Sequence, residues 1–166
     1  MNQTMGTPKP LYLEDLYVGQ RFTSGLYQMY EDRIKAFAAE FDPQPFHLDQ
    51  AAAQGSVFRG LAASGWHTAA AAMRLLVTGG LPLASGIIGL GGELVWSKPA
   101  RPGDALRVES EILEILPSRS KPNQGVVRVR SITVNQNGDQ LQVFTAKILV
   151  FKRIGDPTIR TLEPSK

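Results

Sequence analysis

Residues 65–78 read GWHTAAAAMRLLVT. Alanines and large apolar side chains would occupy nearly every face of a helix formed by this stretch, and a helix that is apolar all round is a buried one. At about 1.5 Å per residue the helix would be about 20 Å long, enough to cross a sheet. Gly79-Gly80 predicts its end. We therefore expect one long central helix with a sheet packed against it.

The residues after this helix are typical of strands. In Ala105–Leu116 the side chains of Leu106, Val108 and Ile112 fall on one face, with charged residues between them. Two later strands are joined through Asn137-Gly138, a strong hairpin signal. The strands predicted here span residues 85–97, 105–116, 126–136 and 140–151.

The residues before the helix predict one strand and two helices. Arg21–Met29 favours a strand, and Asp49 is a good N-cap for a short helix over Gln50–Gln54. Tyr30–Phe41 favours a helix because its apolar residues recur at helical spacing, namely Ile34, Phe37, Ala38 and Phe41. The order of elements predicts an α+β fold, in which one sheet packs its apolar face on the long helix. Dimerisation would protect sheet edges and exposed apolar surface.

Length and composition predict a single domain over 1–166, with a core at about 12–152 and loose arms at both ends. The 166 residues contain no cysteine, which excludes disulfides and thiolate chemistry. The net charge of +3 comes from scattered Lys and Arg, so we expect no nucleic-acid partner. No apolar run is long enough to span a membrane, and the polar start of the chain does not resemble a signal peptide. We expect a cytoplasmic protein.

The stretch FDPQPFHLD, residues 41–49, contains the candidate acid–base pair. Its two prolines should hold Asp42 and Gln44 extended in a stiff loop. A carboxylate beside a histidine can hold a water and move protons to and from it, so Asp42 and His47 are candidates for acid–base catalysis. The alternative is that Asp42 caps a turn and that backbone groups satisfy His47.

Gly65 is the second candidate. As the opening residue of a buried helix, it would present a free backbone N–H at the positive end of the helix dipole. Such a donor can form an oxyanion hole. The alternative is that Ser64 is an ordinary N-cap and Gly65 is needed for packing. His67, next to Trp66, favours a buried or interface histidine over a catalytic one.

Other kinds of site are not indicated. The glycines at 86, 89, 91 and 92 match neither a dinucleotide motif nor a phosphate-binding loop. No cluster has metal-ligand spacing, and no serine has the G-x-S-x-G context of a nucleophile. We expect neither a metal nor a separate cofactor.

The motif Asp42-x-x-Pro45-x-His47, followed by Asp49 and by Gly65, resembles that of MaoC-like (R)-specific enoyl-CoA hydratases of the hotdog superfamily. The later glycines at 89 and 91, Pro99 and Gly103-Asp104 are also similar, so the resemblance covers about residues 12–152. It implies a hotdog fold, a long central helix wrapped by an antiparallel five-stranded sheet, working as a homodimer or higher homo-oligomer on acyl-CoA thioesters. Three positions depart from the family pattern: Gln44 replaces an Asn, Ser64 a His and Met73 a Ser.

The resemblance and the residues together suggest reversible hydration of an enoyl-CoA to a 3-hydroxyacyl-CoA. Asp42 would activate a water held with His47, His47 would deliver a proton to the α-carbon, and the Gly65 N–H would polarise the thioester carbonyl. Coenzyme A would enter only as part of the substrate. The residues expected to bind substrate are Gln44, Phe46, Ser64, Trp66 and His67. Two alternatives remain open, a hotdog acyl-CoA thioesterase and a non-catalytic acyl-CoA binding module.

Overall fold

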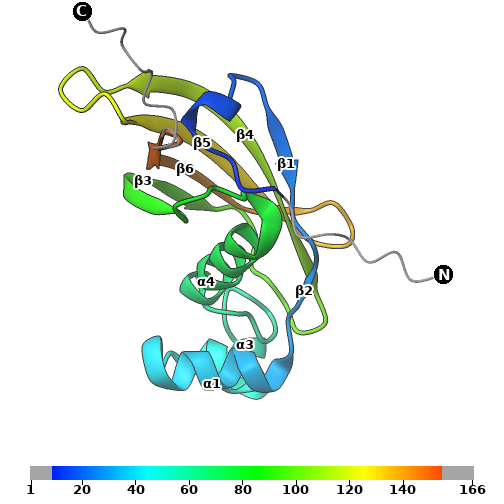
Figure 1. Cartoon of the computed structure of the whole chain (residues 1–166). Helices are drawn as coiled ribbons and strands as arrows, with labels where there is room; N and C mark the ends of the chain where they lie inside the picture. Colours follow the sequence, from blue (N-terminus) through cyan, green and yellow to red (C-terminus); the bar gives the residue numbers. More distant parts are fainter. Residues whose placement is uncertain (1–8, 155–166) are drawn as a thin grey trace, which may run out of the picture.

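An antiparallel sheet of six strands forms one layer of the molecule in a computed structural model that describes residues 9–154. The strand order is β1-β4-β5-β6-β3, and β2 also pairs with β4. Figure 1 shows the strands side by side and curved around one helix. The strands are β1 (Arg21–Thr23), β2 (Tyr27–Gln28), β3 (Ile88–Trp96), β4 (Ala105–Pro117), β5 (Gln124–Val134) and β6 (Gln140–Phe151).

The central helix, α4, lies against one face of this sheet, and α1 and α3 lie near its N-terminal end (Figure 1). The α+β arrangement of a central helix and an antiparallel sheet is therefore confirmed. The helices are η1 (Leu13–Asp15), α1 (Glu31–Phe41), α2 (Pro45–Leu48), α3 (Gln50–Gln54) and α4 (Gly65–Leu75), which continues into the π-helical turn η2 (Leu76–Gly80).

The alternation in β4 places its apolar residues in the core, as predicted. Leu106 and Val108 are fully buried and Ile112 is 1% exposed, because every second side chain of a strand points to the same face. The hairpin between β5 and β6 is confirmed as well, with Gly138 at φ +79° in its turn. Asp49 caps α3 by accepting a hydrogen bond from the Ala52 N–H at 2.7 Å.

The first predicted strand is in fact two, which gives the sheet six strands where the sequence suggested five. The Ser24 Oγ accepts a hydrogen bond from the Val108 N–H at 2.9 Å and donates one to the Gly25 carbonyl. The Val108 N–H is therefore bonded to a side chain and not to the backbone of the neighbouring strand. This interrupts the pairing with β4 between β1 and β2.

Four local predictions also need correction. The central helix is not buried all round in the single chain, because Trp66 and Val77 are 60% and 56% exposed. Its regular α-helical part ends at Leu75, before the predicted end. The stretch after α1 is not all loop: Pro45 starts the one-turn helix α2, since proline suits a first helical position. Phe41 is 63% exposed and does not belong to the buried face of α1.

Residues 1–8 and 155–166, which hold most of the two predicted arms, lie outside the described residues. No helix in residues 9–154 is long and apolar enough to cross a membrane.

Candidate active site

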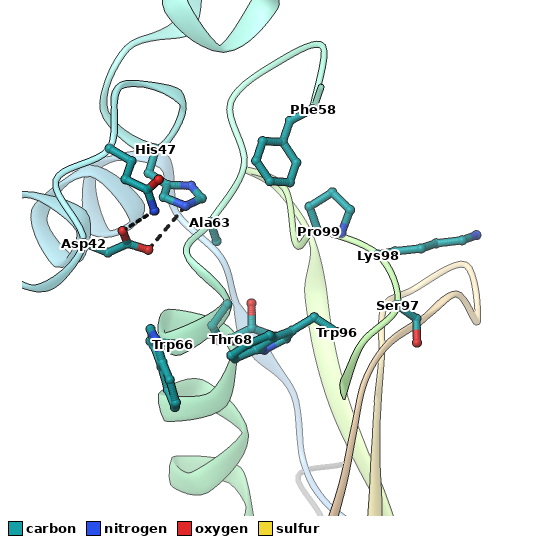
Figure 2. Close-up of a pocket in the computed structure, with 12 residues that line it drawn as sticks. Asp42, His47, Phe58, Ala63, Trp66, Thr68, Trp96, Ser97, Lys98 and Pro99 are labelled. Atoms are coloured by element: carbon teal, nitrogen blue, oxygen red, sulfur yellow. Dashed lines mark hydrogen bonds and ion pairs between the residues drawn. The ribbon is translucent and has the colours of Figure 1, made fainter. Parts of the chain in front are cut away.

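The predicted acid and histidine meet at the point where α1 ends and α2 begins. Asp42 directly follows the last residue of α1, and its backbone N–H still donates to the Ala38 carbonyl. The turn of α2 then brings His47 back toward it, so that His47 Nε2 lies 3.4 Å from Asp42 Oδ2. Figure 2 shows the imidazole and the carboxylate pointing toward one another at one side of a cavity.

The imidazole of His47 is held in one orientation. Its Nδ1 lies 2.7 Å from the carbonyl oxygen of Ala62, and the residue is only 5% exposed. A carbonyl only accepts hydrogen bonds, so the proton of the neutral ring resides on Nδ1. The Nε2 atom therefore faces Asp42 with a lone pair when His47 is neutral, and with a proton when it is charged.

The carboxylate of Asp42 is fixed by two hydrogen bonds. Ser64 Oγ donates to Oδ2 and Gln44 Nε2 donates to Oδ1, both at 2.7 Å. Burial raises the pKa of Asp42, but the bonds from Ser64 and Gln44 and the nearby His47 outweigh it and hold the pKa below its ordinary value. Asp42 is therefore ionised at neutral pH and able to accept a proton.

A cavity of about 400 Å³ opens beside this pair and extends to the start of α4. As the first residue of α4, Gly65 has a backbone N–H with no acceptor inside the helix. The lining residues come from the loops around α2, the start of α4 and the end of β3: Asp42, Gln44, His47, Phe58, Ala63, Gly65, Trp66, Thr68, Trp96, Ser97, Lys98 and Pro99.

Gly65 also meets a packing requirement. A Cβ atom at this position would lie 2.6 Å from Cε2 of Trp96, closer than real side-chain contacts allow. The indole of Trp96 is anchored there, because its Nε1–H donates to the Gly65 carbonyl at 3.0 Å. Both interpretations of the glycine therefore fit this structure: it packs against Trp96, and it lies where a ligand could reach its N–H.

Five of the eight residues singled out from the sequence line the cavity. Asp42, Gln44, His47, Gly65 and Trp66 are brought together as expected.

The other three, Phe46, Ser64 and His67, do not line it. Ser64 is fully buried; it is the N-cap of α4, with Oγ accepting from the Trp66 N–H at 3.2 Å. Phe46 packs edge-on against the ring of His47. In this chain the two side chains support the acid and the histidine from behind.

His67 faces α1. Its ring is stacked on that of Phe37 with centroids 4.7 Å apart, and its Nδ1 is buried without a hydrogen-bond partner among the described residues. Burial, with a further contribution from the charge of Arg33, lowers the pKa of His67. His67 is thus a buried neutral histidine, the kind of residue that the sequence favoured.

The loop before α4 is held by Arg101. Its guanidinium donates to the carbonyls of Gly60 at 2.7 Å, Leu61 at 3.2 Å and Phe58. The next residue along, Ala62, is the one that orients His47. Arg101 therefore braces the segment on which the orientation of the imidazole depends.

Sequence reasoning missed several lining residues, chiefly Phe58, Thr68 and Trp96. Phe58 lies in a loop beside His47, with ring centroids 5.9 Å apart. Trp96 is the last residue of the glycine-rich strand β3. Its position just before Lys98-Pro99 was the sequence feature that could have identified it as a lining residue. Lys98 also borders the cavity and forms an ion pair with Asp139.

The central helix and the curved antiparallel sheet define a hotdog-fold protein. The MaoC like domain model matches residues 13–135, and the chain belongs to this family. A MaoC-like dehydratase from Rhodospirillum rubrum is 60% identical, with 87% of this chain and 99% of that one covered and a TM-score of 0.86. The (R)-hydratase PhaJ1 from Pseudomonas aeruginosa is 32% identical over 87% of this chain and 88% of that one, with a TM-score of 0.71. An uncharacterized Bacillus subtilis protein, YdeM, is 32% identical over 83% of this chain and 96% of its own length.

Proposed function

We propose that this protein catalyses the reversible hydration of a trans-2-enoyl-CoA to a 3-hydroxyacyl-CoA. The observation that carries the proposal is the pair formed by His47 Nε2 and Asp42 Oδ2, 3.4 Å apart at the wall of a cavity. Membership of a dehydratase family and the similarity to an (R)-hydratase support the class of reaction.

In the hydration direction, the reactive state would carry a proton on His47 Nε2 and none on Asp42. A water bound to Oδ2 would give one proton to Asp42 as its oxygen attacks the β-carbon. His47 would deliver its Nε2 proton to the α-carbon on the same side of the double bond. The proton on Asp42 would then pass to Nε2 across the 3.4 Å gap, which restores the starting state.

The charge that develops on the thioester oxygen needs a donor. The N–H of Gly65, at the positive end of the α4 dipole, would supply it. Removing one such donor in other enzymes costs about 3–4 kcal/mol of transition-state stabilisation. No further cofactor is required in this scheme, because conjugation with the thioester already activates the β-carbon; coenzyme A enters as part of the substrate.

The test compares purified wild-type protein with Asp42→Asn and His47→Gln, using crotonyl-CoA and following the loss of enoyl absorbance. We expect each variant to lose about 10²–10⁴-fold in kcat, the usual contribution of a positioned acid or base. Asp49→Asn is the matched control. It makes the same chemical change at an exposed N-cap outside the cavity, where Asn caps equally well.

If Asp42→Asn and His47→Gln both keep the wild-type rate, the proposed chemistry is wrong. Release of free thiol from acyl-CoA without hydration would indicate a thioesterase instead. Tight binding of acyl-CoA without turnover of any substrate would indicate a binding module.

We also propose that the chain works as a homodimer. Within residues 9–154, strand β3 is an edge of the sheet and pairs with β6 alone, and its Leu90 and Val95 are 54% and 48% exposed. Trp66 on α4 and Val77 on η2 are exposed as well. A second copy would cover edge and apolar surface together. Light scattering should give twice the chain mass, and a monomer at all concentrations would contradict this proposal.

A further inference from the structure

A second cavity, of about 440 Å³, lies between α4 and the face of the sheet that packs on it. This volume is within the range of about 300–1,000 Å³ that small-molecule sites occupy. None of the described residues that line it is charged. Its lining residues are Trp66, Ala69, Ala72, Met73, Leu76, Gly89, Gly91, Gly92, Leu94, Ser131, Gln142 and Phe144.

The two cavities meet at the tryptophans. Trp66 lines both of them, and its ring contacts that of Trp96 edge-on with centroids 5.2 Å apart. Figure 2 shows this pair below Asp42 and His47, along the start of α4. Trp96 lines the first cavity and bonds to Gln142, which lines the second. The two cavities therefore adjoin at the tryptophan pair, which would border the path of an acyl chain from the first cavity into the second.

Gln142 is the unusual residue of the second cavity, because it is a large polar side chain only 2% exposed on a mostly apolar surface. The Trp96 Nε1–H donates to its Oε1 at 3.0 Å. An indole N–H only donates, so this bond fixes which end of the amide is oxygen. The Nε2 group is left at the other end, and no side chain or carbonyl in residues 9–154 accepts its hydrogens.

The surroundings of Gln142 are polar as well. Thr133, its partner in the β5–β6 register, is 1% exposed and has an Oγ1 without a hydrogen-bond partner among the described residues. Ser131 lines the cavity and bonds to the Ser110 hydroxyl at 2.8 Å. Gln142 Nε2 has no acceptor among the described residues, so an oxygen of a ligand in this cavity can accept its hydrogens. The amide is thus the polar point that would fix the orientation of a mostly apolar ligand.

We propose that the second cavity binds the acyl chain of the substrate, and that this chain carries an uncharged oxygen, a keto or hydroxyl group, which accepts a hydrogen bond from Gln142 Nε2. The inference rests on the proposed function in one respect, the choice of an acyl-CoA thioester as ligand. A carboxylate does not fit, because the cavity has no cationic side chain to pair with it.

The experiment measures binding without turnover. Isothermal titration calorimetry compares octanoyl-CoA with 7-oxooctanoyl-CoA and 5-oxooctanoyl-CoA, saturated thioesters that cannot be hydrated, in the wild type and Gln142→Met. Methionine keeps the length of the side chain but removes both amide donors. Gln140→Met is the matched control, since Gln140 is exposed on the same strand and lines neither cavity. Both tryptophans of the chain border this path, so a change in their emission on titration reports where the acyl group binds.

We expect the wild type and Gln140→Met to bind one oxo compound about five- to tenfold more tightly than octanoyl-CoA. Gln142→Met should bind all three equally. The proposal is overturned if the wild type binds all three thioesters equally. It is also overturned if the preference for an oxo compound survives in Gln142→Met, or if none of the three binds. If one of these results is found in a protein that hydrates crotonyl-CoA and needs Asp42 to do so, only the proposed subsite is overturned. An oxo preference in a protein without hydratase activity would instead overturn the reaction and keep the subsite.

Discussion

Replacing Ser64 with alanine tests how the acid is prepared for its role. The change removes the 2.7 Å bond to Asp42 Oδ2 and the N-cap bond from the Trp66 N–H. Loss of an N-cap costs about 1 kcal/mol, and loss of a hydrogen bond to a charged group costs about 1.5–3 kcal/mol. Because Ser64 is fully buried, we expect the free energy of unfolding to fall by about 3 kcal/mol in total.

The effect on the pKa has a definite sign. The Ser64 hydroxyl stabilises the ionised carboxylate and so lowers the pKa of Asp42. In Ser64→Ala this contribution is absent while the burial that raises the pKa persists, so the pKa of Asp42 must rise. Since the proposed mechanism requires an ionised Asp42, the acidic limb of kcat/KM should move to higher pH.

The assays are urea unfolding and the pH profile of kcat/KM with crotonyl-CoA. Ser56→Ala is the matched control: Ser56 Oγ donates to the Ala53 carbonyl and accepts from the Phe58 N–H, but it has no bond to Asp42. This control should lose stability and keep its acidic limb. An unchanged or lowered acidic limb in Ser64→Ala would refute the reasoning, because some other group would then hold Asp42 ionised.

Three further predictions follow from the supports around the cavity. Arg101→Met frees three carbonyls of the loop before α4, so we expect kcat to fall about tenfold as His47 loses its fixed orientation, with Arg101→Lys recovering part of it. His67 has a folded-state pKa below its unfolded value of about 6.5, so its contribution to stability is complete above that pH and is lost as the pH falls below it. His67→Phe should therefore flatten the decline in unfolding free energy between about pH 7 and 5 in urea titrations, and an equally steep decline would contradict the assignment. Gly65→Ala forces Trp96 to move, so we expect a loss of about 1–3 kcal/mol in urea and a shifted tryptophan emission, and unchanged emission would show that the packing relaxes elsewhere.

The acid–histidine pair was predictable because it depends on local chain geometry. Asp42 follows the last residue of one helix and Pro45 starts the next, so the approach of His47 is determined by the six residues from Asp42 to His47. The hydrogen bond that Ser64 donates to Asp42 depends on tertiary structure, because it joins residues 22 positions apart.

The direction of His67 was not predictable for a different reason. A helix with apolar residues on nearly every face has no polar side by which its rotation against a sheet can be inferred. His67 and Trp66 are adjacent, yet one is stacked on Phe37 and the other borders two cavities. Trp96 and Gln142 likewise enter the site through strand pairing between β3 and β6, which periodicity within each strand does not specify.

The bond between His47 Nδ1 and the Ala62 carbonyl has a stereochemical consequence. Because Nδ1 is bonded to the backbone, the proton that His47 gives to the α-carbon must leave from Nε2, and the proton that it takes back must return there. Hydration in heavy water would then place a single deuterium on the α-carbon with one handedness, and dehydration would remove that same isotope and leave its geminal neighbour behind.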